Sequence, residues 1–144
     1  MPSGTVEAEF NAPAERVWAV LTDLENTPQW VPDVISVKRL DPGPIGAGSR
    51  LAQVVEVQGR RMDLLVNVTE FDPPRRISHR GTGKSVEISG RTTVVPTEHG
   101  CRVTNEWSLE LSGLLKLGSS IAASWTRRNI EASMEALRKR VETG

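Results

Sequence analysis

The stretch Leu114–Val141, LLKLGSSIAASWTRRNIEASMEALRKRV, decides the fold of this 144-residue chain. It contains no proline and one glycine, Gly118, and its apolar residues recur at the spacing of an α-helix. We predict one helix of about 28 residues, which would be ~40 Å long and would need a large sheet to lie against. One broad side of this helix collects Leu115, Ala122, Trp125, Ile130, Met134, Leu137 and Val141, with Ser133 as a small polar gap.

The first half of the stretch, Leu114–Trp125, is nearly all small or apolar. Small side chains on a buried helix either let another backbone approach or leave space unfilled. Against a curved sheet, the unfilled space would form a cavity. Close packing and an exposed apolar turn are the alternatives.

The composition narrows the class of protein. Lys plus Arg and Asp plus Glu both number 18, so the net charge implies no broad attraction to nucleic acid or to an anionic membrane. The single cysteine, Cys101, cannot form an internal disulfide, and two histidines give no zinc pattern, so we predict no metal and no cofactor. We see neither a signal peptide nor a membrane-spanning stretch, and expect one cytoplasmic domain over residues 1–144.

The rest of the chain reads as strands and two short helical pieces. A helix is predicted from Pro13 to about Asn26, with a possible further turn after Pro28. Alternating apolar residues predict strands at 5–10, 34–40, 50–58, 61–71, 76–80, 85–95 and 101–110. Hairpin-length links join the last six strands, which favours an antiparallel meander. One face of such a sheet must be covered, and only the last helix is long enough to cover it. The fold class is therefore α+β.

Several segments of the chain carry a resemblance to a known family: Ala12–Trp18, Leu21–Asp23, Gln29–Val34, Gly46–Arg50, Thr69–Arg75 and Val95–Val103. With them the sequence resembles the helix-grip fold of the START/Bet v 1-like superfamily, and within it the bacterial polyketide cyclase/dehydrase-like branch. The resemblance spans almost the whole chain. It implies a seven-stranded antiparallel sheet wrapped around the C-terminal helix, with two short helices after strand 1 and a pocket between helix and sheet. Members include lipid carriers, hormone receptors, aromatase/cyclases and toxin-like bacterial proteins.

Apolar and aromatic residues are predicted to line the pocket. Three tryptophans could form walls for a flat apolar ligand, since Trp30 lies in the segment that resembles the family's pocket entrance, while Trp107 and Trp125 fall on predicted inner faces. Ordinary packing is the alternative role for each. The remaining apolar lining is predicted to come from Val54, Leu64, Val66, Val86, Ile88 and Ala122.

Three polar residues are the other candidates for ligand contact. His79 has the strand parity of Ile77, which we place inward, so its imidazole could orient a ligand hydroxyl or act as a general acid or base. It is a weak catalytic candidate, because a lone histidine is more often structural. Asn105 and Asn129 could bind a ligand carbonyl or hydroxyl, or bond internally to the backbone.

Three functions fit these features. The first is a protein that binds a hydrophobic or amphipathic small molecule, such as a lipid or polyketide, as a monomer or homodimer. The second is an enzyme of the polyketide cyclase/dehydratase type that uses His79 for proton transfer. The third is a toxin-like or regulatory interaction protein, in which Leu114, Leu117 and Ile121 would be surface.

Overall fold

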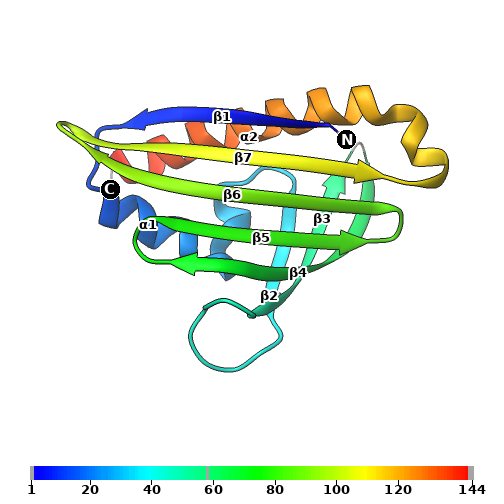
Figure 1. Ribbon diagram of the computed structural model, residues 1–144, viewed down its shortest axis with the longest axis horizontal. Coiled ribbons are helices and arrows are strands. Elements are labelled where there is room, and N and C mark those ends of the chain that lie inside the picture. Colours follow the sequence, from blue (N-terminus) through cyan, green and yellow to red (C-terminus); the bar gives the residue numbers. More distant parts are fainter. Residues whose placement is uncertain (1, 58, 143–144) are drawn as a thin grey trace.

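Seven strands form one antiparallel sheet with a long helix along its edge (Figure 1). The computed structural model describes residues 2–57 and 59–142. The sheet order is β1-β7-β6-β5-β4-β3-β2, which confirms the predicted meander and the helix-grip fold. In chain order the elements are β1 Ser3–Phe10, α1 Ala14–Thr22, the 3-10 helix η1 Leu24–Gln29, β2 Val34–Arg39, β3 Arg50–Val57, β4 Arg60–Asp72, β5 Arg76–Gly83, β6 Val86–Thr97, β7 Gly100–Leu111, the 3-10 helix η2 Gly113–Gly118 and α2 Ser119–Glu142.

The core lies on the concave face of the sheet, beneath α1 and α2. Alternation along the strands sends one set of apolar side chains inward and the other set outward. On β6 and β7 this alternation buries Val86, Val94, Val103 and Leu109. Trp18 on α1 is buried as well, and its ring centroid lies 5.7 Å from that of Phe71 on β4. The concave face is therefore closed by apolar packing at the end where α1 lies.

The second half of α2 is firmly anchored. Leu137 and Val141 are at most 1% exposed. The Arg16 guanidinium donates to the carbonyl of Val141 at 3.1 Å, and the backbone N–H of Asn11 donates to Oε2 of Glu142 at 2.7 Å. Arg138 donates to the carbonyl of Glu9 at 3.1 Å. These contacts tie the C-terminal end of α2 to α1 and to the end of β1.

The first half of the predicted helix differs from the expectation of one continuous helix. Residues Gly113–Gly118 form the 3-10 helix η2, and the α-helix begins only at Ser119. Gly118, Ser119 and Ser120 are weak helix formers, so the break falls where propensity is lowest. Ile121 is 66% exposed, so the side chain of this turn faces away from the sheet. The side chain of Leu115, predicted on the buried side, lies outside the described part of the structure.

Strand β5 is longer than predicted. The sequence suggested a break at residues 81–83, but β5 continues to Gly83, which pairs with Val86. A Cβ atom on Gly83 would lie 2.8 Å from both the carbonyl oxygen of Asp63 and Cδ2 of Leu64. Glycine is thus needed for close packing within the strand and does not end it.

Candidate ligand-binding site

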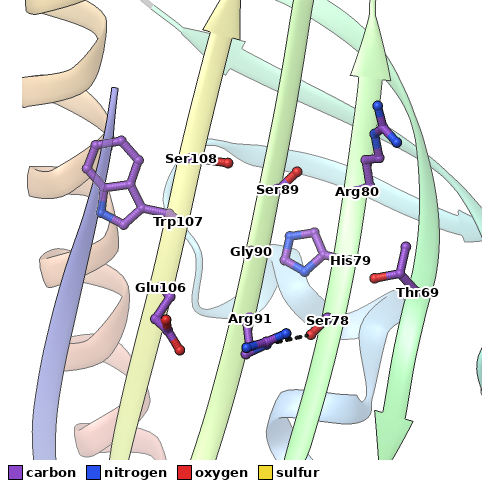
Figure 2. Close-up of a pocket in the computed structure, with 10 residues that line it drawn as sticks. All are labelled: Thr69, Ser78, His79, Arg80, Ser89, Gly90, Arg91, Glu106, Trp107 and Ser108. Atoms are coloured by element: carbon purple, nitrogen blue, oxygen red, sulfur yellow. Dashed lines mark hydrogen bonds between the residues drawn. The ribbon is translucent and has the colours of Figure 1, made fainter. Parts of the chain in front are cut away.

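The concave face carries a row of alternating glycines and polar rings. Gly4 on β1 lies opposite Trp107 on β7, Trp107 lies opposite Gly90 on β6, and Gly90 lies opposite His79 on β5. A Cβ atom on Gly4 would lie 2.9 Å from Cζ2 of Trp107, and one on Gly90 would lie 2.7 Å from Cε1 of His79. Each ring therefore occupies the space that its neighbouring glycine leaves free. Figure 2 shows the His79 ring turned toward Gly90 and the Trp107 indole turned toward β1.

Two polar atoms on this inner face have no hydrogen-bond partner among the described residues. They are Nε1 of Trp107, a donor, and Oδ1 of Asn105, an acceptor. The Asn105 amide is held in place because its Nδ2 donates to Oγ1 of Thr92 at 3.1 Å. A buried polar group without a partner costs about 1–3 kcal/mol, so such groups in a folded protein call for an explanation. A bound ligand that accepts from one atom and donates to the other would provide it.

His79 lies on the same row of the inner face, two strands away from Trp107. Burial lowers the pKa of its imidazole below the usual 6.5, because a charged ring would lose its water without gaining a counter-ion. A neutral imidazole has one donor and one acceptor nitrogen. It can therefore bind a ligand hydroxyl or carbonyl, and it can accept a proton.

A cleft opens between α2 and the edge of the sheet that β2 and β3 form. Its volume is about 510 Å³, within the usual range for small-molecule sites. The cleft is open to the surface and carries two carboxylates, so it is more polar than the pocket that the sequence predicted. It is lined by Pro32, Asp33, Ile35, Glu56, Gly59, Trp125 and Asn129.

Asp33 is the charged group most affected by this setting. Burial raises the pKa of its carboxyl, and this is only partly opposed by hydrogen bonds from its own backbone and from the Asn129 side chain. No arginine or lysine contributes to the shift, and its buried Oδ1 has no partner among the described residues. Sequence reasoning missed Asp33, although it lies three residues after Trp30 in the segment assigned to the entrance.

The structure places the predicted lining residues in three groups. Trp125 and Asn129 line the cleft. Trp30 is half-buried and lies close in sequence to Pro32 and Asp33 of the cleft. Its Nε1 is buried and has no hydrogen-bond partner among the described residues. The third group forms or packs against the inner core, and consists of Leu64, Val66, Val86, Ile88, Trp107 and Ala122.

Val54 does not belong to the inner face. Along β3, Leu51 and Val55 are buried, whereas Val54 alternates with them and pairs with Asp63. Successive side chains of a strand point to opposite faces, so Val54 lies on the outer face. Gln53 takes the inward position instead, and the alternation of Leu51, Gln53 and Val55 was the signal that could have identified it.

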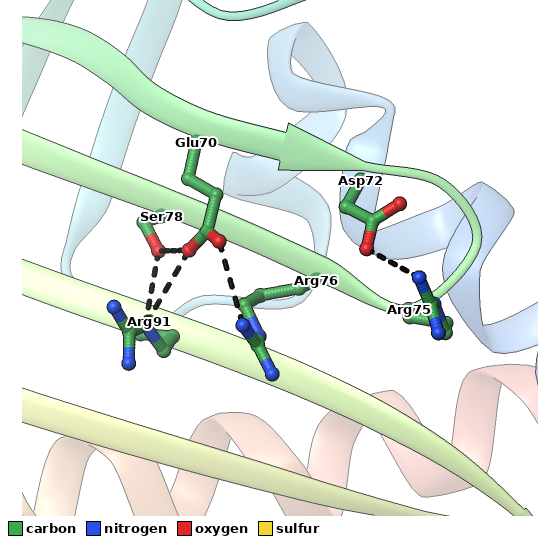
Figure 3. Close-up of polar contacts among 6 residues, drawn as sticks. All are labelled: Glu70, Asp72, Arg75, Arg76, Ser78 and Arg91. Carbon is green, nitrogen blue, oxygen red and sulfur yellow. Dashed lines mark hydrogen bonds and ion pairs between the residues drawn. The ribbon is translucent and has the colours of Figure 1, made fainter.

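A second hollow, of about 350 Å³, lies on the outer face of the sheet (Figure 2). Its floor contains Ser78, Ser89 and Ser108, which alternate along their strands with the inward residues. Beside it, Glu70 accepts a hydrogen bond from Ser78 Oγ at 2.9 Å and pairs with Arg76 and Arg91 (Figure 3). The Ser78 hydrogen bond, and then the two guanidinium groups, lower the pKa of Glu70. These contacts join β4, β5 and β6 on the face away from α2.

Comparison with known protein families identifies the family of the chain. The model of the family described as polyketide cyclase/dehydrase and lipid transport matches residues 1–142. The chain belongs to this family. No helix in the described part of the chain is both long and apolar enough to cross a membrane.

Sequence relatives of this polyketide cyclase/dehydrase family member include uncharacterised proteins from two strains of Mycobacterium tuberculosis. Each is 27% identical over 138 residues, which is 94% of this chain and 95% of the relative. Their names assign no activity.

Solved structures support the fold. A protein of Thermus thermophilus is similar with a TM-score of 0.84 and 24% identity, covering 99% of this chain and 98% of its own. A START superfamily protein of Mycobacterium smegmatis has a TM-score of 0.83 and 21% identity over 99% of both chains. The Zhui aromatase/cyclase of a Streptomyces species has a TM-score of 0.76 and 22% identity, over 97% of this chain and 92% of its own.

Proposed function

We propose that this protein binds a hydrophobic or amphipathic small molecule between α2 and the concave face of the sheet. The observation that carries the proposal is that two buried polar atoms of the inner face, Nε1 of Trp107 and Oδ1 of Asn105, have no partner among the described residues, on the face that also carries the His79 ring. A ligand that bears a carbonyl and a hydroxyl group would satisfy the donor and the acceptor together. The family description, which includes lipid transport, agrees with this class of ligand.

Affinity and orientation would come from different parts of the site. The apolar body of the ligand would gain about 25 cal/mol for each Å² that it buries. Its polar groups would fix its position on the inner face, because the wrong orientation leaves Trp107 and Asn105 unpaired. The cleft beside Trp125 and Asn129 would be the route by which the ligand reaches this face. A cytoplasmic location and a monomeric or homodimeric state stay predictions from the sequence.

A binding panel tests the proposal. Palmitate, cholesterol and an aromatic polyphenol would each be added to the protein, and we expect at least one to raise the melting temperature. Asn105→Ala should weaken binding of that compound roughly tenfold, the value of one neutral hydrogen bond. Asn67→Ala is the matched control, since Asn67 alternates with the buried Val66 and Val68 and faces outward. Binding that is equal in both variants, or a panel without any effect, would refute the proposal.

A cyclase/dehydratase-type enzyme is the second candidate, and the neutral imidazole of His79 favours it. A buried base that stays unprotonated near pH 7 can take a proton from a polyketide chain that the pocket has folded by shape. The similarity to an aromatase/cyclase structure is in keeping with this role. The test compares product distributions from a poly-β-ketone substrate with wild type and His79→Gln. Unchanged products would remove His79 from the mechanism and leave only ligand binding.

A further inference from the structure

Two large apolar side chains are exposed at one end of the molecule. Leu117 in η2 is 88% exposed, and Ile121 in the first turn of α2 is 66% exposed. Figure 1 shows this segment at the end of the molecule opposite the C-terminus. Other exposed large apolar residues, such as Leu65 and Val95, lie on the sheet and are less than half exposed. Leu117 and Ile121 therefore form the most exposed apolar site of the described residues, here called the apolar tip.

The charge around the apolar tip has a single sign within its own segment. Residues 111–130 contain Lys116, Arg127 and Arg128 but no aspartate or glutamate. Arg128 is exposed and follows Ile121 by seven residues, which places both on the same side of α2. In contrast, the part of α2 from Glu131 onward carries both signs. Glu110 and Glu131 flank this range, so the excess of cations is confined to residues 111–130.

A further cation lies near this segment. Lys84 is in the turn between β5 and β6, next to Ser85, and the carbonyl of Ser85 accepts a hydrogen bond from the backbone N–H of Ser112 at 3.0 Å. This contact brings the turn to the start of η2. The apolar tip therefore has positive side chains both along its own helix and on the neighbouring turn.

The apolar tip also adjoins the cleft. Ile121 precedes Trp125 by one helical turn, and Trp125 and Asn129, one turn further, line the cleft. An apolar molecule held at the tip would be one helical turn away from the cleft lining.

We propose that the apolar tip docks this protein onto the surface of an anionic lipid bilayer. Segments that combine exposed apolar residues with lysines and arginines bind at the bilayer interface, where the apolar side chains enter the acyl boundary and the cations meet anionic headgroups. A second copy of the chain is a less favourable partner for the apolar tip. A symmetric contact would place Arg128 and the other cations of residues 111–130 opposite the same cations of the second copy. The inference goes beyond the proposed function and does not depend on which ligand is bound.

Vesicle sedimentation tests the docking directly. The full chain would be mixed with vesicles of phosphatidylcholine alone, or of equal parts phosphatidylcholine and phosphatidylglycerol. We expect sedimentation only with the anionic vesicles, and release by concentrated sodium chloride because salt screens the charges. Leu117→Ser/Ile121→Ser should weaken partitioning by about tenfold or more, since each loses the burial of a large apolar side chain. Arg128→Glu should weaken it as well.

Matched variants and a second measurement make the result decisive. Leu65→Ser/Val95→Ser removes two exposed apolar residues from the sheet and should leave partitioning unchanged. Circular dichroism would establish that every variant is folded, as expected for exposed positions. Failure to bind anionic vesicles, or equal loss in the two double variants, would overturn the proposal. So would a dimer, seen by light scattering, that Leu117→Ser/Ile121→Ser disperses, because the apolar tip would then be an interface between copies.

Discussion

The imidazole of His79 lies over Gly90, and a single methyl group at Gly90 would come within 2.7 Å of its Cε1 atom. The two residues are cross-strand partners on β5 and β6. The position of the histidine ring thus depends on a neighbour that has no side chain. A change at Gly90 should act on the site through His79.

Gly90→Ala should destabilise the fold by about 1–3 kcal/mol, because the new Cβ overpacks a filled interior. Urea unfolding measures the change. Gly46→Ala is the control, since nothing lies within 4 Å of a Cβ there. Combining Gly90→Ala with His79→Ala should cost less than the two single changes added together. Additive costs would mean that the ring and the glycine do not interact.

Trp107→Phe should lower the free energy of unfolding by only about 1–2 kcal/mol. The indole N–H has no described partner, so its removal breaks no hydrogen bond, and the cost comes from the smaller ring, which lacks the indole Cζ2 and Cε2 atoms that lie against Gly4. Trp107→Ala should cost about 3–5 kcal/mol, because it also removes the buried ring. Chemical denaturation of the two variants side by side distinguishes the outcomes. If Trp107→Phe is as damaging as Trp107→Ala, the N–H makes a bond in the folded protein.

Stability should depend on pH through His79. Its pKa is lower in the folded state than the ordinary 6.5, so the unfolded chain takes up the proton first. The free energy of unfolding should therefore be highest at pH values above the pKa that His79 has in the unfolded chain. It should decrease as the pH falls from that pKa to the lower pKa that His79 has in the folded protein.

Urea titrations at a series of pH values check this dependence. His79→Phe, which has no titrating ring at this position, should show a flatter profile over the same window. The other histidine, His99, lies in the turn between β6 and β7, so His99→Phe serves as the control. Equal slopes in wild type and His79→Phe would contradict the buried neutral ring.

Asp33→Asn should stabilise the protein at neutral pH. Burial raises the pKa of Asp33 in the folded protein above the ordinary value of 3.8. The protonated carboxyl therefore stabilises the fold fully only below pH 3.8, and this stabilisation is lost as the pH rises through the pKa of the folded state. An amide avoids the cost of a buried charge. Melting curves at neutral and acid pH test the sign, and the gain should vanish in acid. A loss of stability at neutral pH would mean that the carboxylate has a stabilising partner.

Strict alternation is why much of the fold could be predicted from the sequence. In β4 and β7, apolar residues occupy every second position, which identified the buried Leu64, Val66, Val103 and Leu109. Strand β3 lacks this clarity, because Val54 and Val55 are both apolar, and it is the burial of Leu51 and Val55 that shows which face is the inner one. Patterns of polarity predict faces well where one face is polar, and poorly where both are apolar.

The candidate site was less predictable, because its key features depend on partners distant in sequence. The inward positions of His79 and Asn105 were predicted from strand parity alone. The role of Gly90 follows from its pairing with His79, which no local pattern reveals. The altered pKa of Asp33 depends on burial in the folded chain, with Asn129 of α2 close by, almost a hundred residues away in the sequence.

The fastening of α2 at one end has a mechanical consequence. Its tail is tied by Arg16, Asn11 and Arg138, whereas its head, around Ile121, is largely solvent-exposed. We expect the N-terminal half of α2 to move away from the sheet while its C-terminal half stays packed. Amide hydrogen exchange should then be fast in residues 119–126 and slow in residues 134–141. The ligand proposed above would thus pass in and out without global unfolding.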